Sequence, residues 1–280
     1  MINFNGNLVE NVPITTKNRG LNYGDALFET IRVINNSIMF WEAHYFRLMS
    51  SMRMLRMEIP MSFSPEKLEI QIKDTIKANN LTSSPVKVKL LVYRKDGGLY
   101  LPKSREVDVV ISVEAIENAF FVHNTENYVV DLFKDHFVLA GMLSTLKTTN
   151  KVTQVLASIF AEENCFDNCI ILNEKKSVVE FTNGNLFLVK GNTIKTPPLS
   201  DGCLKGIIRG ELIKMLKKLD DYTLEETSIS PFELQKADEL FLTNSIVGIK
   251  SINQYRKKTY STTLAKQLIG KLNAQARLAE

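Results

Sequence analysis

Alternating apolar and polar residues in the first half of the chain predict β-strands joined by tight turns. Asn-Gly and Asn-Asn pairs favour two-residue hairpin turns because both residue types tolerate a positive φ. Two stretches have this strand-turn-strand pattern, INFNGNLVE (2–10), with a turn at Asn5-Gly6, and FETIRVINNSIMFW (28–41), with a turn at Asn35-Asn36. Two longer strands are predicted at VKVKLLVYR (86–94) and EVDVVISVEAI (106–116).

Other stretches repeat their apolar residues at the spacing of an amphipathic helix. Their ends carry ordinary helix signals, such as Pro65 in a first turn and asparagines after a last turn. The predicted helices span 42–57, 65–80, about 150–164, 206–219 and about 260–275, and a short helix starts at Ser230-Pro231.

The second half of the chain also alternates helices with short β-rich segments. Its predicted strands are 128–133, 168–173, 177–182, two within 184–197, 222–229 and 238–245. We therefore predict an α/β (α+β) protein with an N-terminal domain (1–117), a linker (118–127) and a C-terminal domain (128–280).

Composition and charge narrow the class of protein. Apolar residues make up 44% and charged residues 24% of the 280 residues, which is typical of a folded globular chain. The net charge of +4 is too small to favour nucleic acid or a membrane surface as a partner, and no apolar run approaches the length of a membrane span. Three cysteines without metal-ligand spacing, and no signal peptide, predict reduced thiols, a cytoplasmic protein and no metal site.

Several common catalytic motifs are missing from the sequence. The chain has three histidines, and it lacks HExxH, GxSxG, a Walker loop and a dinucleotide-binding GxGxxG. A lysine nucleophile remains, because lysine forms Schiff bases with carbonyl groups. LSTLKTTNKVTQV (143–155) offers Lys147 and Lys151 for this role.

Pyridoxal phosphate (PLP) chemistry would need four further groups. These are an acid for the pyridine nitrogen, a helix N-terminus and a basic side chain for the phosphate, and nearby hydroxyl groups. The sequence has a candidate for each, namely Glu180 in an apolar strand, Gly206 with Ile207 and Ile208 at a helix start, Arg47 on a helix, and Thr243, Asn244 and Ser245 at a strand end.

In this order along the chain, these features resemble the class IV aminotransferases, the PLP fold-type that includes branched-chain and D-amino-acid aminotransferases and 4-amino-4-deoxychorismate lyase. The likeness runs nearly end to end, and the long central block is its most specific part. It rests on NRGLNYGDALFETIRV (18–33), EAHYFRL (42–48), STLKTTN (144–150), VVEFTNGNLFLVKGNTIKTPPLSDGCLKGIIR (178–209) and ADELFLTNSIVGI (237–249).

The resemblance implies a role for each candidate. Lys147 matches the Schiff-base lysine and general base, whereas Lys151 lies one turn into the predicted helix, on its surface. Glu180 matches the acid that pairs with the pyridine nitrogen. The implied phosphate ligands are Arg47, Gly206, Ile207, Ile208, Asn244 and Ser245.

The resemblance also implies an assembly and a substrate loop. The family fold has two α/β domains with the cofactor in the interdomain cleft, and it forms a homodimer in which a loop of the neighbouring subunit completes the substrate pocket. RKDGGLYLPKSR (94–105) matches that loop, with Arg94, Tyr100 and Arg105 as candidate carboxylate ligands, and Tyr23 is another candidate at the pocket edge.

The choice of reaction rests on less specific features. TNSIVGI (243–249) resembles the lyases, and KTTN (147–150) resembles both the lyases and the D-amino-acid enzymes. Leu99, however, stands in the neighbourhood where lyases commonly have an arginine. We predict an aminotransferase that acts on a small amino acid, with branched-chain substrates included, and a 2-oxo acid. 4-Amino-4-deoxychorismate lyase is the alternative. A degenerate cofactor-binding or scaffold protein is a third hypothesis, and the presence of Lys147, Glu180 and Arg47 argues against it.

Overall fold

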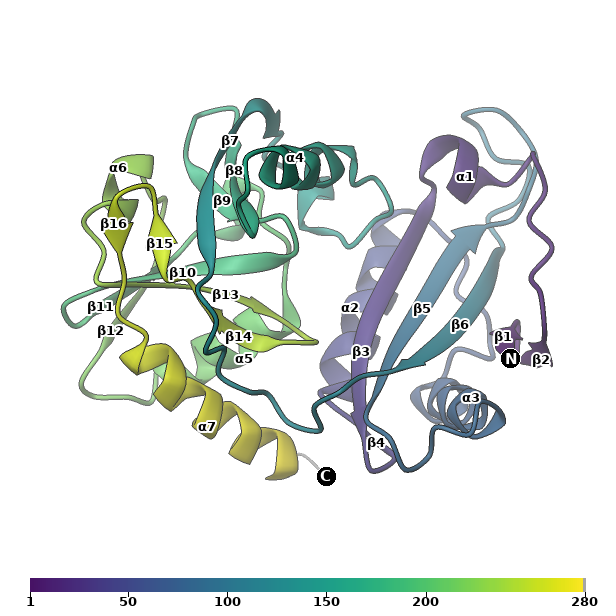
Figure 1. The fold of residues 1–280 in the computed structure, drawn as a ribbon. Helices are drawn as coiled ribbons and strands as arrows, with labels where there is room; N and C mark the ends of the chain where they lie inside the picture. Colours follow the sequence, from purple (N-terminus) through teal and green to yellow (C-terminus); the bar gives the residue numbers. More distant parts are fainter. Residues whose placement is uncertain (279–280) are drawn as a thin grey trace. The chain divides into compact units, whose positions relative to one another are not determined.

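The chain folds into two units, which are described separately. The computed structural model describes residues 1–278, and Figure 1 shows their secondary structure along the chain. Unit 1 contains Met1–Ala119 together with Lys147–Asn150, and unit 2 contains Phe120–Leu146 and Lys151–Leu278. The domain limits drawn from the sequence stay a prediction. The structure adds that the segment around Lys147 belongs to unit 1, although its flanking residues belong to unit 2.

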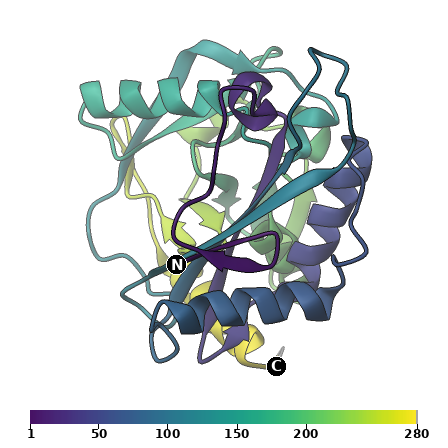
Figure 2. The same ribbon diagram turned by 90° about the vertical axis from the view of Figure 1, so that its right-hand side faces the viewer.

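Unit 1 is built on a six-stranded antiparallel sheet with strand order β2-β1-β6-β5-β3-β4. Its strands are labelled in Figure 1, and Figure 2 shows the same unit turned toward the viewer. Its strands are β1 (Ile2–Phe4), β2 (Asn7–Val9), β3 (Ala26–Ile34), β4 (Ser37–Ile38), β5 (Val86–Arg94) and β6 (Val107–Ala115). Both predicted hairpin turns are confirmed. The turn residues have positive φ at Asn5 (51°), Gly6 (89°), Asn35 (49°) and Asn36 (65°), a conformation that asparagine and glycine adopt more easily than other residues.

The helices of unit 1 pack against this sheet. Helix α2 (Trp41–Met54) packs on β3, and helix α3 (Pro65–Ala78) packs on β6 and β1. The Ser64 side chain caps α3 by accepting a hydrogen bond from the amide of Lys67, and Pro65 occupies the first turn, as predicted. A short helix that the sequence pattern did not predict, α1 (Arg19–Tyr23), precedes β3.

Unit 2 contains a ten-stranded mixed sheet. Its main path runs β12-β11-β10-β9-β8-β7-β15-β16, and β13 pairs with both β10 and β14. The strands are β7 (Val129–Val138), β8 (Asn168–Asn173), β9 (Val178–Phe181), β10 (Gly184–Lys190), β11 (Thr193–Thr196), β12 (Thr223–Glu226), β13 (Glu239–Asn244), β14 (Gly248–Ser251), β15 (Gln254–Tyr255) and β16 (Lys258–Thr259). The last three were not predicted.

Four α-helices surround the sheet of unit 2 in the described part of the chain, namely α4 (Val152–Glu163), α5 (Ile207–Leu216), α6 (Pro231–Leu234) and α7 (Thr263–Leu278). Two 3-10 turns, η1 (Leu143–Thr145) and η2 (Leu199–Asp201), lie in the loops. The buried carboxylate of Glu239 accepts hydrogen bonds from the amides of Leu264 and Ala265. This bond pair fixes the start of α7 at Thr263, slightly later than predicted.

One helix boundary corrects the sequence interpretation of Lys151. Helix α4 begins at Val152, so Lys151 is its N-cap residue and does not lie one turn inside the helix. No helix within residues 1–278 is long and apolar enough to span a bilayer.

Candidate functional site

Lys147 belongs to a short segment that extends the edge of the unit 1 sheet. The amide of Phe28 donates to the Lys147 carbonyl (2.9 Å), and the amide of Thr149 donates to the Ala26 carbonyl (3.1 Å). The Lys147 Nζ atom lies 4.3 Å from the centre of the Phe28 ring, within cation–π range. These two backbone hydrogen bonds to β3 fix the position of the Lys147 backbone, and therefore the point from which its side chain extends.

An asparagine side chain holds the other end of this segment. Asn150 donates from Nδ2 to the carbonyl of Gly24 (3.0 Å), and a Cβ atom at Gly24 would overlap the Asn150 side chain. Gly24 also has a positive φ of 62°. Glycine at this position therefore permits both the turn before β3 and its close contact with the lysine segment.

A buried charge cluster, formed by Glu29, His44 and Arg47, lies in the same unit. Arg47 donates from Nε to Oε1 of Glu29 (2.8 Å) and from Nη2 to Oε2. The Nδ1 atom of His44 lies 2.7 Å from the same Oε2 atom. Strand β3 supplies the carboxylate and helix α2 supplies both partners, three residues apart on one helix face. The predicted phosphate ligand Arg47 is thus held by a buried carboxylate.

The charges in this cluster determine the protonation of its members. Burial alone raises the pKa of Glu29, but the charge of Arg47 and the hydrogen bond from His44 bring that pKa down to about 2. Burial lowers the pKa of His44, against the effect of Glu29. A neutral His44 facing an ionised carboxylate donates from Nδ1, which leaves Nε2 as an acceptor. Within residues 1–278 this buried Nε2 atom has no hydrogen-bond partner, so it is available to a ligand hydroxyl or water.

Unit 2 carries a row of polar side chains across three strands. Glu180 on β9 lies opposite Asn185 on β10, and Asn185 lies opposite Thr243 on β13. Directly opposed residues place their side chains on the same face of a sheet. Oε2 of Glu180 accepts from the amide of Leu204 (2.9 Å), and Nδ2 of Asn185 donates to the carbonyl of the same residue (2.8 Å). The row therefore positions the loop that leads into α5.

That loop ends in an open helix N-terminus. Gly206 is the N-cap of the ten-residue helix α5 and provides no side-chain cap, so the first-turn amides of Ile207 and Ile208 have no acceptor within the helix. A Cβ atom at Gly206 would overlap Oδ1 of Asn185. Glycine is therefore required by the close approach of Asn185. The uncapped amides and the helix dipole suit an anion such as phosphate.

The polar residues at the end of β13 differ in whether their side chains are hydrogen-bonded. Asn244 accepts hydrogen bonds from the amides of Ile246 and Val247 and donates to the carbonyl of Asn183, so its side chain fixes the following turn. Ser245 is half-buried beside it. The Oγ1 atom of Thr243 is buried and has no hydrogen-bond partner in the described part of the chain. The cofactor roles of Asn244 and Ser245 stay predictions.

The predicted substrate loop is anchored by a buried arginine. Arg19 donates to the carbonyls of Gly97 (3.2 Å), Leu99 (2.6 Å) and Tyr100 (3.4 Å). Oδ2 of Asp25 lies 2.9 Å from Nε of Arg19 and also 2.9 Å from Nε of Arg94. The loop is therefore supported from within unit 1.

The four predicted substrate residues lie in different environments. Arg94 is buried, and its other donors bind the carbonyls of Leu55 and Arg56, so these donors are already engaged within the fold. The Tyr23 and Tyr100 rings are 5.8 Å apart, which brings these two candidates together. Arg105 is exposed. The substrate roles stay predictions.

Several polar residues of these clusters escaped the sequence interpretation. Glu29, His44 and Asn185 acquire their partners only through folding, as does the pair Arg19 and Asp25. The sequence pattern that could identify such a residue is a single polar residue inside an apolar strand, as Asn185 is in GNLFLV. Such a residue needs a partner when it is buried.

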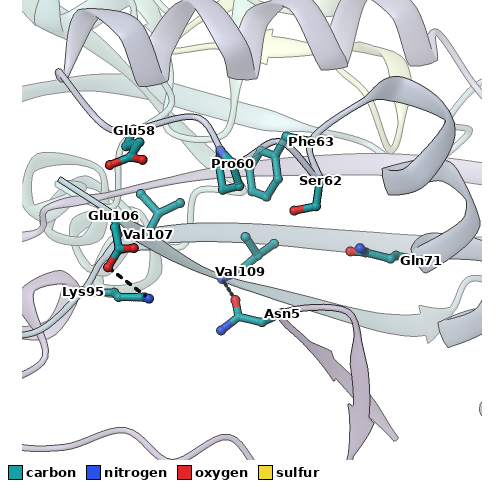
Figure 3. Close-up of a pocket in the computed structure, with 10 residues that line it drawn as sticks. All are labelled: Asn5, Glu58, Pro60, Ser62, Phe63, Gln71, Lys95, Glu106, Val107 and Val109. Carbon is teal, nitrogen blue, oxygen red and sulfur yellow. Dashed lines mark hydrogen bonds and ion pairs between the residues drawn. The ribbon is translucent and has the colours of Figure 1, made fainter. Parts of the chain in front are cut away.

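A separate hollow of about 390 Å³ lies in unit 1 (Figure 3). Its lining includes Glu58 and the ion pair between Lys95 and Glu106 (3.3 Å), and it includes none of the predicted site residues. The pairing of Lys95 with Glu106 leaves no cation there for a phosphate. We therefore assign this hollow no part in the chemistry.

The two groups of residues fit PLP by their donor chemistry. Unit 1 offers the Lys147 amine for an aldehyde, the Arg47 guanidinium for a phosphate, and the Nε2 atom of His44 as an acceptor for a hydroxyl group. Unit 2 offers the Glu180 carboxylate for a pyridinium nitrogen, and the α5 amides for a phosphate. Within residues 1–278 no cluster of side chains suits a metal ion.

Comparisons of the sequence and of the structure with known proteins agree on one family. The model of the family described as "Amino-transferase class IV" matches residues 26–255. A putative branched-chain-amino-acid aminotransferase of Methanocaldococcus jannaschii is 30% identical, over 89% of this chain and 85% of its own. The aminodeoxychorismate lyase of Vibrio harveyi is 25% identical, over 84% of each chain. The structure of the branched-chain aminotransferase from Thermobaculum terrenum in its PLP form is similar with a TM-score of 0.85 and 21% identity, covering 98% of this chain and 93% of that one.

Proposed function

We propose that this chain, which belongs to the class IV aminotransferase family, is a PLP-dependent transaminase that moves an amino group between a small amino acid and a 2-oxo acid. The placement of Lys147 is the observation that carries the proposal. Its backbone is hydrogen-bonded to β3, in the same unit as the Glu29, His44 and Arg47 cluster. The relatives named as branched-chain aminotransferases support this reaction.

Lys147 has two tasks in this proposal. Bound PLP supplies an aldehyde and an electron-withdrawing ring, which makes the Cα proton of the substrate acidic. Lys147 would hold the cofactor covalently through its Nζ amine, the nucleophile for that aldehyde. Once a substrate amine is bound, the free Nζ amine of Lys147 would act as the general base that accepts the Cα proton of the substrate.

The other residues would bind the charged groups of the cofactor, namely the ring nitrogen and the phosphate. Glu180 keeps a proton on the ring nitrogen through a charge-assisted hydrogen bond, and its bond to the Leu204 amide restrains the carboxylate. Arg47 binds the phosphate with the guanidinium orientation set by Glu29. We assign further phosphate contacts to the amides at the start of α5, where Gly206 allows a close approach, and to the end of β13. These contacts come from Ile207, Ile208, Asn244 and Ser245.

The substrate loop favours a small, uncharged side chain. Leu99, Tyr100 and Leu101 at its tip are 78%, 90% and 84% exposed and carry no positive charge. An apolar tip suits a branched or aliphatic side chain better than a dianionic substrate. 4-Amino-4-deoxychorismate lyase remains the second candidate, because the TNSIVGI turn resembles the lyases and a relative bears that name.

A substrate panel tests the reaction. The PLP-loaded protein is supplied with leucine, valine or D-alanine and 2-oxoglutarate, and glutamate is measured. We expect glutamate from at least one amino acid. Release of pyruvate and p-aminobenzoate from aminodeoxychorismate, with no glutamate from any amino acid, would show the lyase reaction instead.

We also propose a homodimer in the cytoplasm. Exposed apolar residues gather in unit 2 before and along α4, namely Leu139, Met142, Leu143, Val152, Val155, Leu156 and Ile159. Such a run suits a protein interface.

The three cysteines are free, as expected in a reducing compartment. Light scattering should give the mass of a dimer. Ile159→Lys should lower that mass, and the exposed control Glu163→Lys on the same helix should not.

A further inference from the structure

A groove of about 630 Å³ lies in unit 2, apart from every residue assigned above. Leu132 of β7, Leu172 of β8 and Tyr255 of β15 line it and are buried. Phe137 of β7 and Phe232 of α6 also line it, and Phe232 is 78% exposed. The groove is therefore largely apolar in its lining, and its volume suits one small molecule.

Three cations line the same groove. They are Lys134 of β7, Lys176 in the β8–β9 turn and Arg256 in the β15–β16 turn. Arg256 pairs with Asp131 at 3.3 Å, whereas Lys134 and Lys176 have no ion-pair partner within residues 1–278. The lining described contains no Asp or Glu. The groove therefore combines apolar surface with two lysines that have no ion-pair partner in the described part of the chain.

We propose that this groove binds a small amphipathic carboxylate, with its apolar chain on Leu132, Leu172 and Phe232 and its carboxylate toward the cations. The charge complementarity selects an anion, and the apolar lining selects a ligand with a hydrocarbon body over inorganic phosphate. The groove shares no residue with the proposed catalytic set, so its ligand binding is independent of the transaminase reaction.

The backbone offers substitutions that remove charge without distorting the fold. Lys176 and Arg256 have positive φ values of 62° and 54°, a conformation in which glycine is less strained than a long side chain. Lys176→Gly should therefore leave the melting temperature nearly unchanged, whereas Arg256→Gly also removes the ion pair with Asp131 and should lower it slightly. Arg56→Gly is the matched control, since Arg56 has a φ of 53° and lies in unit 1.

Calorimetry on the full PLP-loaded chain tests the proposal with octanoate, 1-octanol and acetate. Octanoate should bind more tightly than octanol, which lacks the charge, and than acetate, which lacks the chain. Each glycine variant should weaken octanoate binding about fivefold. Arg56→Gly should not change it, and Lys147→Ala should not either, which separates the groove from the catalytic site.

Three outcomes would overturn the proposal. They are octanol binding as tightly as octanoate, equal octanoate binding by the Lys176→Gly/Arg256→Gly double variant, and an absence of octanoate binding. If a second copy of the chain covers the groove instead, the double variant will change the mass measured by light scattering and octanoate will not bind.

Discussion

The two units supply functional groups of different kinds. Unit 1 contributes charged side chains, with Arg47 and His44 both bound to the buried carboxylate of Glu29. Unit 2 contributes backbone amides at α5, held by a polar row in which Glu180 and Asn185 bind the backbone of one loop. Side-chain charges are altered by pH and by single substitutions. Backbone donors are altered chiefly by substitutions that shift the backbone itself. Substitutions in the two units should therefore impair cofactor binding and activity in different ways.

The largest effect should come from Lys147. Lys147→Ala removes both the covalent attachment and the base, and we expect the transamination rate to fall by about 10⁴-fold or more. The measurement is glutamate formation by PLP-loaded protein. Lys151→Ala should keep nearly full activity, because Lys151 is the N-cap residue of α4 and lies outside the segment Lys147–Asn150 that belongs to unit 1. Equal losses in the two variants would contradict the assignment.

Glu180→Gln should have the next largest effect. Glutamine retains an oxygen that accepts from the Leu204 amide but cannot hold a proton on the ring nitrogen, so we expect kcat to fall by about 10²- to 10³-fold. The melting temperature should change little. A large loss of stability with an unchanged kcat would mean that Glu180 has only a structural role.

Glu29→Gln tests the charge cluster of unit 1 through stability. The folded-state pKa of about 2 lies below the ordinary value of 4.5, so Glu29 stabilises the fold above about pH 4.5, and this contribution is lost as the pH falls toward 2. Removing the charge leaves Arg47 buried without its partner and should cost about 3–5 kcal/mol at pH 7.

Urea unfolding between pH 7 and pH 3 measures this contribution. The acid-induced loss of stability should be smaller in Glu29→Gln than in the wild type. Glu69→Gln is the control, because its ion pair with Lys73 (2.7 Å) is partly exposed and worth about 1 kcal/mol at most. If both variants behaved alike, the buried cluster would not dominate acid stability.

Gly206→Ala should have the smallest effect and test the backbone donors of unit 2. The added Cβ atom must displace Asn185 or the loop, and we expect the affinity for PLP to fall about tenfold. Gly210→Ala, on the same helix with open space around it, should instead raise stability by about 1 kcal/mol. Fluorescence titration with PLP compares them. Unchanged affinity in Gly206→Ala would remove the phosphate role of this helix start.

Local chemistry made much of the fold predictable. The Asn5-Gly6 and Asn35-Asn36 turns follow from residues that accept positive φ, and the start of α3 follows from Ser64 and Pro65. Strands β14–β16 were missed because they are short and are stabilised by pairing with other strands of the sheet.

Non-local pairing limited prediction of the site. The Lys147 segment pairs with β3, more than a hundred positions earlier in the chain, and no local pattern reports that contact. Glu29 likewise meets His44 and Arg47 only when α2 packs on β3. The family resemblance pointed to Lys147, Arg47 and Glu180, but the residues that hold Arg47 and the α5 loop became visible only in the folded chain.

Borohydride reduction tests the central claim most directly. The PLP-loaded protein is reduced, digested and analysed by mass spectrometry to find the lysine that carries the pyridoxyl group. We expect the modification on Lys147, with Lys151 unmodified. Modification of Lys151, or of no lysine in 143–155, would contradict it.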